Sequence, residues 1–82
     1  MPKYTPLREW LKRHPEDNVV VTFSEIEKII GERLPRNARK YFKFWDNTQG
    51  TMAIHAIRSA GFQTVMVDRQ NETVRLKRTQ GV

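Results

Sequence analysis

The chain has 82 residues, enough for one domain with one small core, and its fifteen Lys and Arg against nine Asp and Glu give a net charge of +6 at pH 7. The sequence contains no cysteine, which excludes a disulfide scaffold, a thiolate zinc site and a cysteine nucleophile. It offers neither an apolar run near the roughly 18 residues of a membrane span nor a secretory signal, so we expect one cytoplasmic domain, residues 1–82, with no membrane contact, no metal and no cofactor.

The first half of the chain predicts a helix, a strand and a second helix, in that order. Apolar residues at helical spacing place the first helix at about residues 4–13. The run from Val19 to Phe23 is apolar and β-branched at successive positions, which predicts a short strand buried on both faces. Ser24 and Glu27 have the spacing of a capping box, and Gly31 stands where a helix C-cap glycine is expected. We therefore expect Ser24 to be the N-cap of the second helix.

The second half predicts two more helices followed by a β-hairpin. The helices are expected at about residues 36–45 and 51–60, and with the second helix they form a trihelical unit at about residues 24–60. The hydrophobic period then changes from helical to alternating, which predicts a hairpin at about residues 62–78. The predicted fold class is α+β: four short helices and a C-terminal hairpin, with the run from Val19 to Phe23 as a candidate third strand. This order of elements resembles a winged helix–turn–helix.

The third predicted helix separates charged from apolar side chains. At 100° per residue its cations fall within about 100° of arc, with no acidic residue among them, while Tyr41 and Trp45 fall on the opposite, core-facing side. Like charges at this spacing repel one another, so the pattern favours a face that binds a polyanion; a face that is only solvated is the alternative. The predicted phosphate contacts here are Arg33, Arg36, Arg39, Lys40 and Lys43.

The hairpin carries a second set of cations. Alternation along its second strand sends Val74 and Leu76 to one face and Arg75 and Lys77 to the other. In a winged helix such a wing lies along the phosphates of the duplex. Exposed edge strands also carry Lys and Arg to prevent pairing with other sheets, which is the alternative explanation. The predicted wing contacts are Arg69, Arg75, Lys77 and Arg78.

The fourth helix precedes the hairpin and is the element that a winged helix would insert into a DNA groove. Its small apolar residues predict a thin core stripe, which leaves polar side chains facing outward. Asn47, just upstream, is expected to be a turn residue or the N-cap of this helix. The predicted groove contacts are Gln49, Thr51, His55 and Arg58.

No group of residues has a spacing that indicates catalysis. His14 stands before a proline, Ser24 is expected to cap a helix, and Asp46 and Asp68 are far apart in the sequence. A domain of this size also encloses a substrate pocket with difficulty. We therefore expect a protein that is not an enzyme, and we assign no catalytic residue.

These features together predict a nucleic-acid-binding module whose partner is double-stranded DNA rather than RNA. The alternative is a protein-interaction module, such as a small phage or defence-related factor, that uses the same basic face on an acidic partner. Phe44 lies off the core stripe of the third helix and is the expected anchor in that case. The sequence leaves the oligomeric state open.

A pattern of short motifs extends over nearly the whole chain. It consists of Tyr4-x-Pro6-Leu7, Thr22-Phe23-x-Glu25-Ile26-Glu27-x-Ile29-Ile30-Gly31, Leu34-Pro35, Ala38-Arg39-x-Tyr41 and Trp45-x-Asn47. The pattern resembles a small uncharacterised prokaryotic and phage domain family, whose members occur alone or appended to longer proteins, some of them nuclease-like. The resemblance implies no established activity, and its link with nucleases favours nucleic acid as the partner by analogy alone.

Overall fold

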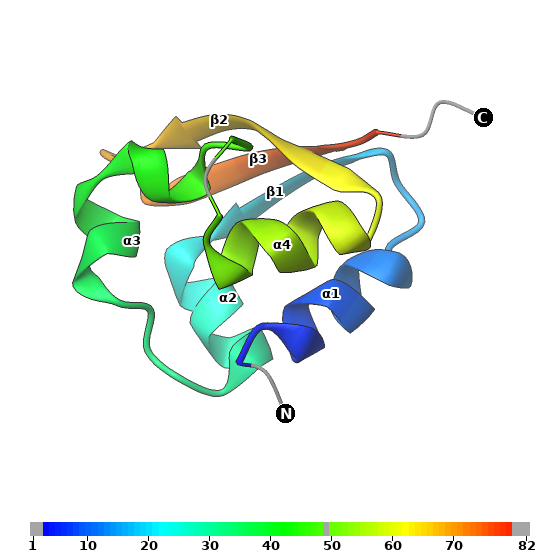
Figure 1. The fold of residues 1–82 in the computed structure, drawn as a ribbon, viewed down its shortest axis with the longest axis horizontal. Helices are drawn as coiled ribbons and strands as arrows, with labels where there is room; N and C mark the ends of the chain where they lie inside the picture. The colour runs from blue at the N-terminus through cyan, green and yellow to red at the C-terminus, as the bar shows by residue number, and fades with distance from the viewer. Residues whose placement is uncertain (1–2, 49, 80–82) are drawn as a thin grey trace.

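The computed structural model describes residues 3–48 and 50–79, which form four α-helices, a short 3-10 helix and three strands (Figure 1). The helices are α1 (Thr5–Lys12), α2 (Phe23–Ile30), α3 (Arg36–Lys40), the 3-10 helix η1 (Phe42–Trp45) and α4 (Met52–Ser59). The strands are β1 (Asn18–Thr22), β2 (Phe62–Asp68) and β3 (Thr73–Arg78). The predicted α+β fold with four helices and a C-terminal hairpin is therefore confirmed. No helix within the described ranges is long and apolar enough to cross a membrane.

The three strands form one antiparallel sheet in the order β1-β3-β2, so β3 is the central strand. β1 joins the hairpin as the expected third strand, but it ends at Thr22, and Phe23 is the first residue of α2. The register of β2 on β3 shifts between Thr64 and Met66, which leaves Val65 as the extra residue of a β-bulge.

Helices cover one face of the sheet and leave the other face open. Figure 1 shows α1, α2 and α4 gathered on one side of the three strands, where α4 packs against β2 and α2 packs against β1. Val19 and Val21 of β1 are buried on this side, whereas Val20 between them is 55% exposed. The prediction that β1 is buried on both faces is therefore wrong, because the helices are too few to cover the second face.

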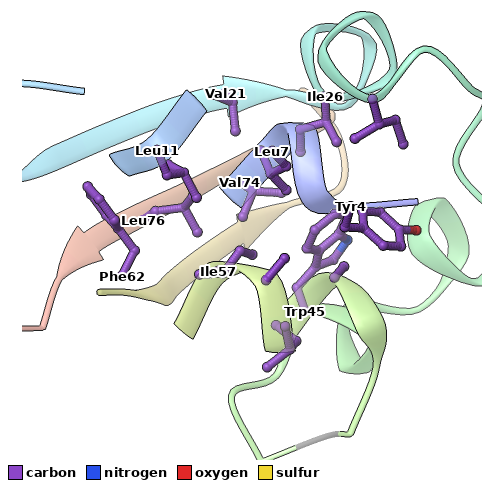
Figure 2. Packing of buried hydrophobic residues seen from close by; sticks show 14 of the residues in the cluster. Tyr4, Leu7, Leu11, Val21, Ile26, Trp45, Ile57, Phe62, Val74 and Leu76 are labelled. Atoms are coloured by element: carbon purple, nitrogen blue, oxygen red, sulfur yellow. The ribbon is translucent and has the colours of Figure 1, made fainter. Parts of the chain in front are cut away.

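The core lies between the sheet and these helices (Figure 2). Leu7 of α1 and Val74 and Leu76 of β3 are fully buried in it. Trp45 at the end of η1 is also fully buried, and its ring stacks on that of Phe23 with the ring centroids 5.9 Å apart. Large aromatic rings of this kind supply much of the apolar area that a small core can bury.

Helix α2 begins two residues earlier than the capping pattern predicted. Thr22 is the N-cap: its Oγ1 accepts from the backbone N–H of Glu25 at 2.9 Å, and the Glu25 carboxylate accepts from the backbone N–H of Thr22 at 2.9 Å. Thr22 and Glu25 have the same spacing as Ser24 and Glu27, so the sequence offers two capping boxes. The earlier one forms because it places Phe23 in the core as a helical residue, and Ser24 is left exposed. At the other end Gly31 is the expected C-cap, with φ +74°.

The third predicted helix is not continuous. α3 ends at Lys40, Tyr41 is extended with φ −122° and ψ 118°, and η1 then winds as a 3-10 helix to Trp45. The backbone carbonyl of Ala38 accepts from the indole Nε1 of Trp45 at 2.8 Å, and this bond holds the buried ring against α3. Aromatic residues lose side-chain freedom in an α-helix, and the run from Tyr41 to Trp45 contains four of them. The angles expected for a single helix therefore do not apply beyond Lys40.

This break also changes where the aromatic side chains lie. Tyr41, predicted to be in the core, is 53% exposed. Phe44, predicted to project as an exposed anchor, packs against the core and meets Trp45 edge-on, with ring centroids 4.9 Å apart. The prediction that Trp45 is buried is confirmed.

Candidate functional site

The structure brings α3 and the turn of the β2–β3 hairpin together at one end of the molecule (Figure 1). Arg39 of α3 links the two, since its Nη1 donates to Oε2 of Glu72 at 2.9 Å. The exposed side chains of Arg36 and Lys40 on α3 therefore lie at the same end as the exposed Arg69 in the hairpin turn. None of these three cations makes an ion pair with an acid in the described part of the chain.

Arg39 itself is held by acidic residues and is not available to a ligand in the way that the sequence predicted. Besides its contact with the hairpin, its Nη2 donates to Oε1 of Glu27 at 2.8 Å. The pKa of Glu27 is lowered because its carboxylate accepts from the backbone N–H of Leu34, at 2.8 Å, and from Arg39. The hydrogen bond to Glu27 in turn raises the pKa of Arg39. Arg33 lies exposed in the loop before α3 and adds a weaker pull on the same carboxylate.

Exposed cations continue from α3 toward the start of α4. A depression of about 300 Å³ is lined by Asn37, Tyr41, Lys43, Phe44 and Thr51. Lys43 is exposed on η1, and Thr51 is the residue before α4, so the depression joins the cations of α3 and η1 to the first turn of α4. The ammonium of Lys40 lies 5.7 Å from the centre of the exposed Tyr41 ring. A phenol and two ammonium groups are thus presented close to one another.

Thr51 and Asn47 make structural contacts that differ from those expected from the sequence. Thr51, predicted to contact a groove, is the N-cap of α4: its Oγ1 accepts from the N–H of Ile54 at 3.2 Å and donates to the Phe44 carbonyl at 3.2 Å. Asn47, one of whose two expected roles was that cap, pairs with the edge of β2. Its amide accepts from the N–H of Thr64 and donates to the Thr64 carbonyl, both at 2.8 Å. These bonds satisfy two backbone groups that a sheet edge leaves unpaired.

The outer face of α4 carries two of the predicted groove contacts. His55 and Arg58 are exposed, as the amphipathic pattern predicted. Arg58 reaches back toward the preceding loop, where its Nη1 donates to the Asn47 carbonyl at 3.3 Å. Gln49 lies outside the described residues, so its predicted contact stays a prediction.

Arg78, predicted to be a wing contact, ties the end of β3 to the loop before β1. Its Nε donates to Oδ1 of Asp17 at 2.8 Å, and its Nη2 donates to the carbonyls of His14 at 2.9 Å and Glu16 at 3.2 Å. The guanidinium also lies 4.7 Å from the centre of the Phe62 ring. With three oxygen partners and a ring, Arg78 has little left to offer a phosphate.

Arg75 and Lys77 project from the open face of the sheet. The alternation that predicted this is confirmed, since Val74 and Leu76 are buried and the two cations are exposed. The alternative explanation, protection of an edge strand, is wrong because β3 is hydrogen-bonded on both sides. Arg75 and Lys77 face away from α4 and do not join its surface.

Apart from Arg33 in the loop before α3 and the ion-paired Arg39 and Arg78, the predicted cations occupy three separate places. The cationic end, as we call the first of them, contains Arg36, Lys40, Lys43 and Arg69 with Tyr41 among them. The second is the outer face of α4 with His55 and Arg58, and the third is the open sheet face with Arg75 and Lys77. The depression lined by Lys43 and Thr51 places the first next to the second.

Comparison with known proteins identifies the family of the chain. Residues 4–79 match a family that is described as a domain of unknown function, DUF7662. The chain belongs to this family. A search of curated proteins and a search of solved structures each found no match. The expected resemblance to a small uncharacterised domain family is thereby confirmed at the level of the family, with no activity attached.

Sequence reasoning missed two features of this DUF7662 domain. Tyr41 was assigned to the core because a continuous helix was assumed, and the aromatic run after Lys40 was the only signal against that helix. The open sheet face was missed because three successive valines, at positions 19–21, hide the alternation of β1. The shortness of the predicted helices was a usable signal for an open face, since four short helices can cover one face of a sheet but hardly both faces.

Asp46 and Asp68, the two aspartates weighed for catalysis, each accept hydrogen bonds within a turn of the DUF7662 domain. Asp46 accepts from the backbone N–H and the hydroxyl of Thr48 at 2.9 and 2.8 Å, and these bonds lower its pKa. Asp68 accepts from Asn71 and Gln70 in the hairpin turn, and the bond from the Asn71 N–H is the first cause of its lowered pKa. Across residues 3–48 and 50–79, no three His, Asp or Glu side chains gather as metal ligands would.

Proposed function

We propose that this domain binds double-stranded DNA through α4 and the cationic end, in the manner of a winged helix. The support begins with the topology. The order α1-β1-α2-α3-α4-β2-β3 and the sheet order β1-β3-β2 put α4 directly before a hairpin whose turn meets α3. A helix followed by a hairpin is the combination with which a winged helix–turn–helix enters a major groove and touches the flanking phosphates.

The observation that carries the proposal is the depression between η1 and the first turn of α4. Lys43 and Tyr41 line it together with Thr51, so the cations of the cationic end border the beginning of the helix that would enter the groove. Lysine ammonium groups and tyrosine hydroxyls are both common donors to phosphate oxygens. Arg36 and Arg69 extend the same end with two more exposed cations.

DNA is favoured over RNA because of the groove that α4 needs. B-form DNA has a major groove about 12 Å wide, which admits an α-helix. The major groove of A-form RNA is deep and narrow, and side chains cannot read its bases. His55 and Arg58 on the outer face of α4 are the side chains proposed to reach base edges. Because most of the contacts are to phosphates, we expect binding with little sequence preference.

The proposal is for a binding module without catalysis, located in the cytoplasm where DNA is accessible in a prokaryotic cell. It narrows the surface predicted from the sequence. Arg39 and Arg78 are held in ion pairs, and Arg75 and Lys77 lie on the far face of the sheet, so none of the four is included. A link of the family with phages and nucleases stays a prediction.

The test is a fluorescence-anisotropy titration of labelled duplex DNA, single-stranded DNA and duplex RNA at several salt concentrations. We expect the duplex DNA to bind most tightly and the logarithm of its binding constant to fall linearly with the logarithm of the salt concentration. The double substitution K40Q/K43Q should reduce the size of that slope by about 2, since each phosphate contact contributes about 0.9.

The matched control is K12Q/R13Q, which removes the same two charges from the end of α1. Lys12 is the last residue of α1 and Arg13 its C-cap, so the control also removes cations from the end of a helix, as K40Q does at the end of α3 and K43Q does in the last turn of η1. Both are exposed, and the end of α1 lies at the opposite end of the molecule from α3 (Figure 1). An equal loss in both variants would mean that only net charge matters, and no binding to any nucleic acid at low salt would end the proposal.

A further inference from the structure

The open face of the sheet is a second surface with a chemistry of its own. The strand register arranges its side chains in rows across the three strands. One row is Val20, Arg75 and Met66, and the next is Asn18, Lys77 and Gln63. All six are exposed, and in Figure 1 the helices lie on the other side of the strands.

The middle row places a cation between two exposed aliphatic side chains. Val20 is 55% exposed and Met66 is 57% exposed, and each is the direct cross-strand neighbour of Arg75. The β-bulge at Val65 also leaves that residue 51% exposed beside Met66. Scattered exposed apolar residues are normal on a protein surface, but here the bulge and the strand register gather Val65, Met66 and Val20 around one cation.

The stability of the sheet does not explain this row. A pair of opposite charges across strands stabilises a sheet, yet the neighbours of Arg75 are Val20 and Met66 and those of Lys77 are Asn18 and Gln63. Asp68 borders the same face one row away, but its carboxylate is taken up by the hairpin turn. Arg75 and Lys77 are two residues apart on one face, about 7 Å, so they repel each other.

We infer that the open sheet face docks an acidic, partly apolar segment of a partner protein. Arg75 and Lys77 would receive carboxylates, and Val20 and Met66 would contact apolar side chains beside them. Carboxylates on alternate residues of an extended segment are also about 7 Å apart, which matches the spacing of the two cations along β3. Arginine and methionine are both enriched in protein–protein interfaces.

Other occupants fit this face less well. A second copy docked face to face would set Arg75 and Lys77 against the same cations, and such like charges disfavour association. Single-stranded nucleic acid is gripped by aromatic side chains that stack on its bases, and the six side chains of the two rows include none. Duplex DNA offers phosphates to Arg75 and Lys77, but its thymine methyl groups lie inside a major groove that admits a helix or a two-stranded ribbon. The face of a three-stranded sheet would therefore leave Val20 and Met66 without apolar contact.

The experiment follows backbone amide shifts of the isotope-labelled domain by NMR during titration with two synthetic peptides. Both have about seven residues, enough to extend along β3. Glu at positions 3 and 5 faces Arg75 and Lys77, and Ser fills the positions on the opposite face. Positions 1 and 7, on the same face as Glu, are Leu in one peptide (the Glu/Leu peptide) and Ser in the other. We expect the Glu/Leu peptide to bind more tightly and to shift amides of all three strands. R75Q/K77Q should weaken its binding about tenfold, as two exposed charge pairs would. V20T/M66Q should weaken it about fourfold through lost apolar contact.

K40Q/K43Q serves as the control that separates the two proposals. It should leave peptide binding unchanged while it weakens DNA binding, whereas R75Q/K77Q should have the converse effect. Shifts confined to α3 and the hairpin turn, equal affinity for both peptides, or tighter binding of single-stranded DNA to the sheet face would each overturn the inference. Sedimentation of the free domain as a dimer that R75Q/K77Q strengthens and V20T/M66Q weakens, with no peptide shifts, would assign the face to a second copy instead.

Discussion

The two faces of the sheet are built from the same three strands, yet the side chains of one face are buried and those of the other are exposed to solvent. On the covered face Val21, Val74 and Leu76 are buried against the helices. On the open face their sequence neighbours Val20 and Arg75 remain exposed. The helical side also neutralises Arg39 with two acidic residues, whereas Arg75 has no acidic neighbour across the strands.

This difference shows that an arginine in a basic chain can either form ion pairs within the fold or remain available to a ligand. Arg39 meets Glu27 and Glu72, which are 12 and 33 residues away in the sequence, so its role depends on contacts that only the fold creates. Arg75 meets two aliphatic residues instead and stays available. Net charge alone does not distinguish these two cases, and the charge that remains unpaired is what a ligand encounters.

The sharpest way to test the comparison is to make the same substitution on each face. Val21→Thr places a hydroxyl in the core at a residue that is 1% exposed, and we expect it to lower the free energy of unfolding by about 1–3 kcal/mol. Val20→Thr keeps the β-branched shape on the open face and should change the free energy by less than about 0.5 kcal/mol. Urea denaturation followed by circular dichroism measures both. Equal costs would mean that the open face is covered in solution.

The second prediction compares the two arginines. Arg39→Gln leaves Glu27 and Glu72 without their cation and should lower the free energy of unfolding by about 1–2 kcal/mol. Arg75→Gln, the same change on the open face, should alter it by less than about 0.5 kcal/mol. Thermal unfolding at one salt concentration gives both values. If Arg75→Gln proved the more costly, then Arg75 would have a structural partner on its own face.

The third prediction concerns the pH dependence on the helical side. The pKa of Glu27 in the folded state lies below its ordinary value of 4.5, because the Leu34 N–H and Arg39 favour the charged carboxylate. Its contribution is therefore complete above about pH 4.5 and is lost as the pH falls through the folded-state pKa. Glu27→Gln should cost about 1 kcal/mol near pH 7 and progressively less below pH 4.5.

The measurement is the free energy of unfolding of the wild type and of Glu27→Gln at closely spaced pH values between about 3 and 7. Asp46 and Asp68 also have lowered pKa values, so some loss of stability in acid should remain in the variant. A difference between the two proteins that does not shrink in acid would contradict the role given to Glu27.

Much of the fold followed from local patterns in the sequence. The hairpin, the helix that ends at Gly31 and the burial of Trp45 were predicted from periodicity and turn chemistry. The break at Tyr41 was not, because the helical spacing of the apolar residues outweighed the aromatic run after Lys40, and the bond from the buried indole of Trp45 to the carbonyl of Ala38 forms only in the folded chain. Local patterns cannot report such a contact.

The candidate site was less predictable than the fold. The exposure of Arg36, Lys40 and Lys43 agrees with the sequence, since it depends only on their being off the core stripe. The ion pairs of Arg39 with Glu72 and of Arg78 with Asp17 could not be predicted from sequence spacing, because the partners are far apart in the sequence and meet only in the folded chain. The position of Arg75 could not be predicted either, because it depends on the order of the strands, which places β3 at the centre of the sheet and not at its edge.

The smallest expected change in stability comes from the repulsion between Arg75 and Lys77, which concerns the open face alone. Arg75 and Lys77 stand about 7 Å apart on the same face, within the screening length of about 30 Å at 0.01 M salt but beyond that of about 3 Å at 1 M. R75Q/K77Q should therefore raise the free energy of unfolding by a few tenths of a kcal/mol at low salt and leave it unchanged at 1 M salt. Chemical denaturation with urea, which adds no ions, at the two salt concentrations measures the difference. A loss of stability at low salt would mean that the two cations are paired in solution, and the open face would then have no free charge with which to hold a carboxylate.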